Sequence, residues 1–532
     1  MRSPFLLALL ISIAVSGGSP TPLQAQSNIR APENFALESY RKARKLLDAG
    51  VDAIGGVEAL ARVNTVTRIM TVKRMDPGQA RAAWNGEYEV GKLPVYSQGI
   101  MTSALDYAGS RLWIRHRDEP IPGEVDAFTE VVTADNSFTL RWMRAETPFH
   151  APVSAGAARA RFSREVRLYP EGLLKAALRQ ASTLEYSGRS TLDGIGVEII
   201  SFVDPQGTRI LLSFDAATHL LLRSEAVSDH SVLGDSTLSA TFSDYRRAGA
   251  LVLPYRTVSK RNDRAARDYV LTSIRFDADL APLDLAPPQS RIAVSEGPDT
   301  PALVPRGGGV YEVHGEYNVM FAVFADYVLL VEAPRDEGYA RQVFELIRSV
   351  EPAKPIKVVA THHHFDHIGG MRYAASAASE IWAASDAKAE IERALASRPT
   401  IRPDDYVKAP KPVTVRLIDG RHVFDDGKQR VEIADVGPGD HSSQLLMAYF
   451  PGIATMLVAD LWDVPAPDTP LTGADAGQVM TRVGELGWKV ERMLAMHGAA
   501  ASTTALERSL VARKSYLASW TKDASPVPPA RR

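Results

Sequence analysis

The strongest constraint in this sequence is the run 361–370, which reads Thr-His-His-His-Phe-Asp-His-Ile-Gly-Gly. Four histidines and one carboxylate lie within six positions. Protonated imidazoles packed so densely would repel one another, and histidine contributes little to a hydrophobic core. Around a divalent cation the crowding becomes favourable, because neutral imidazole and carboxylate are good ligands for zinc-like metals. The run therefore indicates a metal site rather than a solvated polar loop.

The flanking residues place this run on a strand-to-helix loop. Residues Ile356–Ala360 form an apolar stretch typical of a β-strand, and Gly369-Gly370 precedes a segment with helical character. Loops that follow buried strands commonly display functional groups. We therefore expect the histidines to be held by a rigid strand and exposed to a ligand.

Length and charge limit the class of protein. A chain of 532 residues is too long for one hydrophobic core, so two or more domains are expected. The composition, with 45% hydrophobic and 23% charged residues, is ordinary for a globular protein. A formal net charge of −2 provides no basic excess for phosphate contacts, so no nucleic-acid partner is expected. A small-molecule substrate is expected instead, and the oligomeric state stays open.

The first residues resemble a secretory signal peptide over 1–25. Arg2 precedes the apolar stretch Phe5–Val15, and Leu23-Gln24-Ala25 offers a small-residue cleavage site. The apolar stretch is shorter than the roughly 20 residues that span a bilayer, so cleavage is favoured over an uncleaved anchor. The sequence thus predicts an exported protein, periplasmic or secreted, without a stable membrane span after cleavage. It contains no cysteine, which excludes disulfides and thiolate ligands.

Residues 27–285 predict a β-rich antiparallel domain with short helices. Helical spacing before Gly55-Gly56 and again over 57–63 indicates two short helices at its start. Four later segments are short, rich in β-formers and separated by Gly and Asp, which predicts a meander. They are 197–202, 209–214, 220–227 and 238–242.

A proline-rich linker is predicted over 286–305, and it is followed by Gly307-Gly308-Gly309. Residues 306–515 then alternate apolar strand-like runs with helical segments, which favours a layered α/β domain. The predicted strands are 319–324, 328–331, 356–360, 445–450 and 454–458, with a helix over 338–350. The tail 516–532 is expected to be disordered.

The histidine run resembles, position for position, the His-x-His-x-Asp-His signature of the metallo-β-lactamase fold superfamily. Further residues follow in that family's order: a histidine on a glycine-containing loop, a carboxylate after a strand, and a final His-Gly pair. The resemblance covers roughly residues 306–500 and implies an αββα sandwich, of mixed α+β class, for the C-terminal domain. The matching positions are His362, His364, Asp366, His367, His441, Asp460 and His497.

The resemblance implies a role for each of these residues. His362, His364 and His441 would hold one metal ion, while Asp366, His367 and His497 would hold a second, with Asp460 bridging the two. Three neutral imidazoles leave a zinc site open to a water molecule, which loses its proton near neutral pH. We therefore expect two divalent metal ions per chain, zinc in the first place, with iron or manganese as alternatives. Asp366 is also the expected catalytic residue.

The expected activity is a dinuclear-metal hydrolase that uses metal-bound hydroxide to cleave an ester, lactone or amide bond. His364 stands where diiron redox relatives have glutamate, and Asp460 stands where familiar β-lactamases have cysteine. A phosphodiesterase or sulfatase of the same fold is the alternative enzyme. A carrier-like binding protein that keeps only structural metal is the alternative outside enzymes, although a structural zinc site would normally be closed by four ligands.

The N-terminal half only weakly resembles the β half-barrels of lipoprotein carriers, and no residue role follows from that likeness. It is expected either to cover the metal cleft and receive an apolar substrate, or to serve as a scaffold or dimerisation module. Among the other residues, His363 is expected to face solvent or to lie behind the ligands. His314 and His422 are expected to be structural, while Tyr317 and Asn318 are candidates for the edge of the site.

Overall fold

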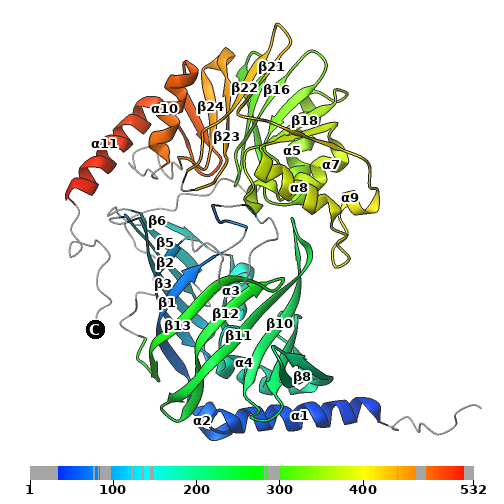
Figure 1. Cartoon of the computed structure of the whole chain (residues 1–532), viewed down its shortest axis with the longest axis vertical. Coiled ribbons are helices and arrows are strands. Elements are labelled where there is room, and N and C mark those ends of the chain that lie inside the picture. The colour runs from blue at the N-terminus through cyan, green and yellow to red at the C-terminus, as the bar shows by residue number, and fades with distance from the viewer. Residues whose placement is uncertain are drawn as a thin grey trace, which may run out of the picture.

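The structure is a computed structural model with an N-terminal and a C-terminal domain, drawn at the bottom and the top of Figure 1. It describes residues 34–75, 78–81, 83, 97–121, 124–133, 137–143, 149–152, 154–280, 283, 300–439, 441–462 and 475–519. The predicted signal peptide lies outside the described residues, as does most of the predicted linker. In the part of the chain that is described, no helix is both long enough and apolar enough to cross a membrane.

Two helices open the N-terminal domain, as the sequence predicts. They are α1 (Phe35–Ala53) and α2 (Val57–Arg62). Gly55 and Gly56 separate them with φ angles of 128° and 90°, a region that side chains rarely adopt. A Cβ atom on Gly55 would also lie 2.5 Å from the carbonyl oxygen of Ala250, so glycine is needed for close packing against the sheet.

The body of this domain is one antiparallel sheet of thirteen strands, in the order β6-β5-β4-β3-β2-β1-β13-β12-β11-β10-β9-β8-β7. Two meanders meet where β1 pairs with β13. The strands are β1 (Thr65–Arg74), β2 (Ser97–Asp106), β3 (Arg111–Ile121), β4 (Glu124–Val132), β5 (Ser137–Met143), β6 (Phe149–Pro152), β7 (Glu185–Leu192), β8 (Ile195–Val203), β9 (Arg209–Asp215), β10 (Leu221–His230), β11 (Gly234–Ala248), β12 (Leu251–Arg261) and β13 (Arg264–Phe276).

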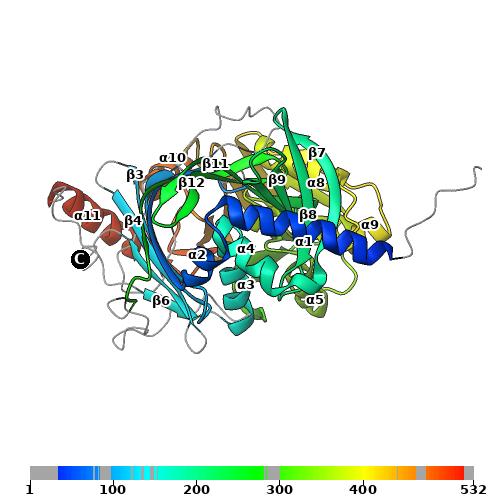
Figure 2. The same cartoon turned by 90° about the horizontal axis from the view of Figure 1, so that it is seen from below.

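The sheet is strongly curved, and two helices fill its concave side (Figure 2). These helices, α3 (Ala155–Val166) and α4 (Pro170–Arg179), join the two meanders and are followed by the short turn η1 (Ala181–Thr183). On β1 the side chains of Val66, Met70 and Val72 are buried. The strand thus shows the period-two alternation of a sheet with one packed face.

The C-terminal domain contains two sheets packed face to face, with helices outside (Figure 1). The first sheet has the order β14-β15-β16-β17-β18-β19-β20, and the second runs from β21 to β26 in sequence order. Its strands are β14 (Ala302–Gly307), β15 (Val310–His314), β16 (Val319–Val323), β17 (Val328–Val331), β18 (Ile356–Ala360), β19 (Glu380–Ala383), β20 (Thr414–Leu417), β21 (Arg421–Asp425), β22 (Arg430–Asp435), β23 (Leu446–Phe450), β24 (Thr455–Ala459), β25 (Arg492–Ala495) and β26 (Ala500–Ser502).

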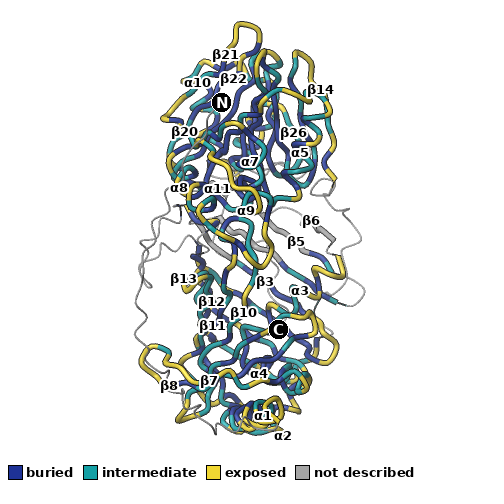
Figure 3. Tube along the Cα trace, turned by 90° about the vertical axis from the view of Figure 1, so that its right-hand side faces the viewer, coloured by how far each residue is buried: buried dark blue, intermediate teal, exposed yellow. Residues whose placement is uncertain are grey.

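Helices complete the layers of this domain. They are α5 (Glu337–Val350), α6 (Phe365–Ile368), α7 (Met371–Ala377), α8 (Ser385–Ala396), α9 (Asp405–Lys408), the turn η2 (Pro451–Ile453), α10 (Ala476–Leu486) and α11 (Thr503–Ser519). Met320, Leu329, Ile433 and Leu457 form part of a fully buried cluster between the two sheets. Figure 3 shows such buried segments along the strands of both domains. The layered arrangement confirms the αββα fold expected for this half.

Two domain boundaries differ from the sequence-based prediction. The predicted linker 286–305 is too long, because β14 begins at Ala302 and pairs with β15. The predicted disordered tail 516–532 begins too early, because α11 continues to Ser519. Residues 520–532 lie outside the described residues.

The turn between β10 and β11 joins the two domains. Val232 in this turn is buried and belongs to the hydrophobic core of the C-terminal domain. Asp235 accepts hydrogen bonds from the backbone N–H groups of Thr400 and Ile401, at 2.9 and 3.0 Å. These contacts anchor the N-terminal sheet beside α8 and α9.

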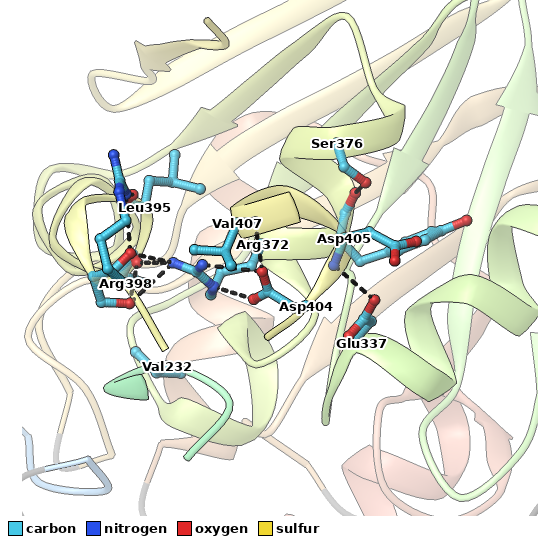
Figure 4. Close-up of polar contacts among 12 residues, drawn as sticks. Val232, Glu337, Arg372, Ser376, Leu395, Arg398, Asp404, Asp405 and Val407 are labelled. Carbon is cyan, nitrogen blue, oxygen red and sulfur yellow. Dashed lines mark hydrogen bonds and ion pairs between the residues drawn. The ribbon is translucent and has the colours of Figure 1, made fainter. Parts of the chain in front are cut away.

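A buried arginine organises the region that receives this turn. Arg372 on α7 is paired with the carboxylate of Asp404, and it donates to the hydroxyl of Ser397 at 2.9 Å. Figure 4 shows Arg372 pointing toward Asp404, with Val232 of the N-terminal domain in the same region. The loop between α8 and α9 is therefore held by a buried charge pair where the other domain docks.

The two sheets of the C-terminal domain are joined by a buried carboxylate, Glu312 on β15. It accepts hydrogen bonds from Arg492 on β25 at 3.0 Å, from Arg306 at 2.5 Å and from His314 at 2.7 Å. Burial alone would raise the pKa of Glu312, but these hydrogen bonds lower it from 4.5 to about 2. A carboxyl group with a lowered pKa stabilises the folded state above its ordinary pKa and loses that contribution as the pH falls.

We therefore expect the Glu312→Gln variant to lack part of the acid sensitivity of the native protein. The native protein should lose on the order of 2 kcal/mol of unfolding free energy from this group between about pH 5 and about pH 3. Urea unfolding at both pH values would measure the difference. Glu345→Gln, an exposed change on α5, is the control, and equal pH dependence in E312Q and the native protein would contradict the prediction.

Candidate metal centre

The structure brings together all seven residues that the histidine motif and its downstream partners predict as ligands. They follow the carboxyl ends of strands: His362 and His364 follow β18, Asp366 and His367 lie on α6, His441 follows β22, Asp460 follows β24 and His497 follows β25. Strands β22 and β24 are both antiparallel to β23, and β24 is parallel to β25. These three strands therefore run in one direction and deliver their side chains to one edge.

One group of possible ligands contains His362, His364, His441 and Asp460. The Nε2 atoms of His362 and His441 lie 3.1 Å apart. His362 Nδ1 lies 3.1 Å from the Thr361 hydroxyl, which itself donates to Glu332 and therefore accepts from the imidazole. This hydrogen bond leaves the lone pair of His362 on Nε2, where it faces His441.

A second group contains Asp366, His367, Asp460 and His497. The Nε2 atom of His367 lies 2.9 Å from Asp460 Oδ2, and His497 Nε2 lies 3.4 Å from Asp366 Oδ2. Asp460 Oδ2 is also 3.4 Å from His441 Nε2 in the first group. Asp460 therefore lies between the two groups, as a bridging ligand must.

Glu332 is a buried carboxylate that the sequence did not single out. Its Oε1 accepts a hydrogen bond from His367 Nδ1 at 3.1 Å and another from Thr361. This contact places the remaining lone pair of His367 on Nε2, toward Asp460 and Asp366. Such carboxylate–histidine contacts fix the tautomer and orientation of metal-binding histidines. In the sequence, the only feature that marks Glu332 is its place directly after the apolar strand β17.

The backbone is strained at two of these strand ends. Glu332 has a φ of 82° and Ala459, which precedes Asp460, has a φ of 49°. Both angles lie in the left-handed region, which costs energy for residues other than glycine. Strain of this kind persists where the surrounding structure holds it and commonly marks functional sites. Here the left-handed backbone at Glu332 and at Ala459 directs the carboxylates of Glu332 and Asp460 toward the histidines.

The pKa shifts of the histidines are those expected of a site that binds a cation. Burial, and then the neighbouring His367, His364 and His441, hold the pKa of His362 well below its usual value, so this imidazole is neutral. His367 behaves in the opposite way. Burial lowers its pKa, but Asp460, Glu332 and Asp366 together raise it well above 6.5. The carboxylates thus favour a cation at His367 Nε2, whether a proton or a metal ion.

A loop of the N-terminal domain completes the wall of the centre. The carbonyl oxygen of Ala80 lies 2.9 Å from His363 Nε2 and 3.2 Å from His364 Nε2. Gln79 Nε2 donates to Asp366 Oδ1 at 2.6 Å, and the carbonyl of Gly78 accepts from the Phe365 N–H at 3.0 Å. Nothing in the sequence separates this segment from other Gly-containing loops, so the sequence analysis missed it.

The loop also decides which nitrogen of His364 is free. A carbonyl oxygen only accepts, so His364 Nε2 carries the proton and Nδ1 keeps its lone pair. That Nδ1 is buried and has no hydrogen-bond partner, and the same is true of Asp460 Oδ1. Buried polar atoms are normally satisfied, so two orphaned acceptors here call for a cation. The donor set therefore fits a metal ion.

The other predicted residues divide into correct and incorrect expectations. His363 does not face solvent, because its side chain is fully buried and lies behind the ligands between Ala80 and Ser442. His314 pairs with Glu312, and His422 packs on Trp382 at 4.6 Å between ring centroids. Both are structural, as expected.

Tyr317 and Asn318, which the sequence placed at the edge of the site, flank its final histidine. The Tyr317 ring lies 5.0 Å from that of His497. Asn318 Nδ2 donates to the carbonyls of Ala495 and Gly498 at 3.0 and 2.8 Å, on either side of His497. These contacts fix the backbone that carries this histidine.

Comparison with known proteins agrees with this geometry. Residues 314–447 match the family model of the metallo-beta-lactamase superfamily. The C-terminal half has the metallo-β-lactamase fold. No curated protein matches the chain.

Among solved structures, the chain is similar to the metallo-beta-lactamase FIM-1 from Pseudomonas aeruginosa in its mono-zinc form. The two sequences are 19% identical and the TM-score is 0.31. The match covers 42% of this chain and 99% of that one. It is also similar to a metallo-beta-lactamase from Pontibacter korlensis, with 17% identity, a TM-score of 0.32, and coverage of 41% and 100%. A metallo-beta-lactamase from Hirschia baltica gives 18% identity, a TM-score of 0.31, and coverage of 40% and 96%.

The metallo-β-lactamase-fold domain depends on Glu332 for the orientation of His367, and this dependence can be tested. The Glu332→Gln variant should bind metal about 10- to 100-fold more weakly, because the amide no longer favours the required tautomer and charge. Competition with a chromogenic chelator would measure the affinity. Glu380→Gln, a partly exposed change on β19, is the control. An unchanged affinity in a folded E332Q protein would show that Glu332 has no such role.

Proposed function

We propose that this protein is a metal-dependent hydrolase that cleaves an ester, lactone or amide bond of a small molecule at a centre of two divalent ions. The observation that carries this proposal is the pair of ligand groups sharing Asp460. A structural zinc ion is normally enclosed by four protein ligands. Here each group has three ligands of its own and shares Asp460 with the other, so neither ion would have four protein ligands to itself. This supports an open centre at which water and substrate could bind.

In this proposal His362, His364 and His441 hold the first ion, and Asp366, His367 and His497 hold the second. Divalent ions in such a centre lower the pKa of water and polarise the bond to be cleaved. Zinc is the expected metal, since imidazole and carboxylate suit it, although iron and manganese use the same ligands.

The protein's own groups have distinct tasks. Burial raises the pKa of Asp366, but His367, the hydrogen bond with His497 and His364 together lower it below its usual value, so this side chain stays a carboxylate. Its Oδ1 atom is fixed by Gln79, and its Oδ2 atom faces His497. A fixed carboxylate at this place can accept a hydrogen bond from the attacking water and orient it, which is the role we assign to Asp366.

We further propose that the protein acts after export, in the periplasm or outside the cell. The support is the signal-like segment 1–25, with its short apolar stretch and small-residue cleavage site. The complete absence of cysteine is compatible with an oxidising compartment.

Metal analysis and a substrate screen test the proposed function. The purified protein should carry about two metal equivalents per chain, and removal of metal by a chelator should abolish hydrolysis, because the water would lose its activation. Asp460→Ala should lower both occupancy and turnover, whereas Asp48→Ala on the exposed face of α1 should change neither. The screen should cover esters, lactones, β-lactams and other amides, with phosphodiesters and sulfate esters as the competing classes.

Two outcomes would contradict the proposal. A protein that contains no metal and hydrolyses substrates equally well with chelator present does not use this centre. A protein that holds one tightly bound ion and hydrolyses none of these classes would instead fit the carrier-like alternative, in which the metal is structural.

A further inference from the structure

The two helices on the concave side of the N-terminal sheet (Figure 2) line a cavity of about 490 Å³. The turns that follow β2 and β8 complete its walls. We call this space, lined by α3 and α4, the helix cavity. Its volume lies in the range of roughly 300–1,000 Å³ that is typical of small-molecule sites. All of its described lining residues lie between Tyr107 and Ile210, so no described residue of the C-terminal domain contributes to it.

The buried part of the helix cavity is apolar. Val132, Leu173 and Phe202 line it, and all three side chains are buried. The ring of Tyr107 is buried in the same wall, and its hydroxyl donates a hydrogen bond to Glu171 at 2.8 Å. This hydroxyl is therefore already satisfied by the protein. An apolar chain that enters the cavity leaves water, and the burial of each methylene group stabilises the complex.

Cationic side chains line the more exposed part of the helix cavity. Arg159 on α3 and Arg179 on α4 are exposed, and Lys175 on α4 is half-buried. Within the described part of the chain, none of these three side chains forms an ion pair. Asp204 is the one carboxylate among the described lining residues, and it is paired with Arg167 at 2.8 Å. The exposed edge of the described lining is therefore positively charged.

Two of these cations repel each other. Lys175 and Arg179 are four residues apart on α4, a spacing at which like charges destabilise a helix. Burial, and then Arg179, lower the pKa of Lys175, and the attraction of Glu171 and Asp277 offsets this effect only in part. Arg179 is fixed at the wall of the cavity, because its Nη1 atom donates to the carbonyl of Tyr107 at 3.3 Å. An anion bound beside both cations would remove the repulsion between them.

We propose that the helix cavity binds a long-chain carboxylate, a free fatty acid. The apolar chain lies among the buried lining residues, and the carboxylate pairs with Lys175 and Arg179. A neutral lipid would leave these cations unpaired, and a small anion would make no use of the apolar walls. A cavity of this volume holds one chain of about twelve carbon atoms but not a two-chain phospholipid. The inference does not depend on the proposed hydrolase function, and it gives the N-terminal domain a ligand of its own.

The first experiment compares ligands that differ in chain length or in charge. The purified full-length protein is titrated calorimetrically with dodecanoate, decanoate and decanol, each below the concentration at which it aggregates. Decanoate should bind roughly 15-fold more weakly than dodecanoate, because each buried methylene group contributes about fourfold. Decanol should bind about fivefold more weakly than decanoate, because it lacks the charge that pairs with the cationic edge. The absence of dodecanoate binding, or equal binding of decanoate and decanol, would overturn the proposal.

The second experiment uses variants of the cavity lining. Lys175→Gln and Arg179→Gln should each weaken dodecanoate binding about fivefold, as expected for the loss of a partly exposed ion pair. Ala176→Trp, at a half-buried position of the lining, should weaken it more than about tenfold, because the indole ring occupies the space of the chain. The matched controls are Lys45→Gln on α1 and Ala157→Trp on α3, two exposed positions outside the lining. Equal affinities in K175Q and K45Q would overturn the proposal, and this comparison stands even if A176W does not fold.

Two further measurements separate the helix cavity from the metal centre and from a membrane surface. Treatment with a chelator should leave dodecanoate binding unchanged, because no described ligand of the metal centre lines the cavity. Loss of binding together with the metal would place the carboxylate at the metal centre and overturn the proposal. Loss of hydrolysis alone would concern only the proposed function. Binding to phosphatidylglycerol vesicles without any binding of dodecanoate would also overturn the proposal, in favour of a membrane surface.

Discussion

The carbonyl oxygen of Ala80 accepts hydrogen bonds from two adjacent histidines of another domain, and the form of the metal centre depends on this contact. Because a carbonyl has no proton to give, it fixes His364 with a free Nδ1 inside the ligand group. It also accepts a hydrogen bond from Nε2 of the buried His363. A backbone atom of the β-rich domain therefore determines the protonation pattern of the hydrolase-fold domain.

The other ligands are fixed from within their own domain, through the ends of buried strands. Strand ends at one edge supply the histidines and carboxylates, and the left-handed backbone at Glu332 and Ala459 turns two carboxylates inward. Glu332 and Thr361 then orient His367 and His362 by hydrogen bonds. The rigid strands fix the position of each ligand, and the hydrogen bonds from Glu332 and Thr361 fix the orientation of the imidazole rings.

The features that could be predicted from the sequence are those marked by short, local patterns of residues. The apolar run 356–360, the dense histidines and the ordered later ligands are short patterns, and each predicted element containing them is present in the structure. Glu332 was missed because a carboxylate after a strand is common and its partner lies 35 residues away. The segment 78–81 was missed because its role depends on domain docking, across more than 280 residues of sequence. The solvent-facing alternative for His363 was wrong for the same reason.

Helices α3 and α4 were also not located, although short helices were expected in this domain. Their own residues are good helix formers that lie between two β-rich stretches, but their place on the concave side depends on the pairing of the two meanders through β1 and β13. This pairing joins strands about 200 residues apart in the sequence, so no local periodicity predicts where the helices pack.

The shared hydrogen bonds of Ala80 have a thermodynamic consequence for the molecule as a whole. The free energy that the docked loop contributes to binding of the proposed metal at His364 equals the free energy that metal binding would contribute to docking of the loop. Under the proposed function, metal binding and the docking of the two domains are therefore coupled. Loss of the proposed metal would therefore also weaken the docking of the N-terminal domain on the C-terminal domain.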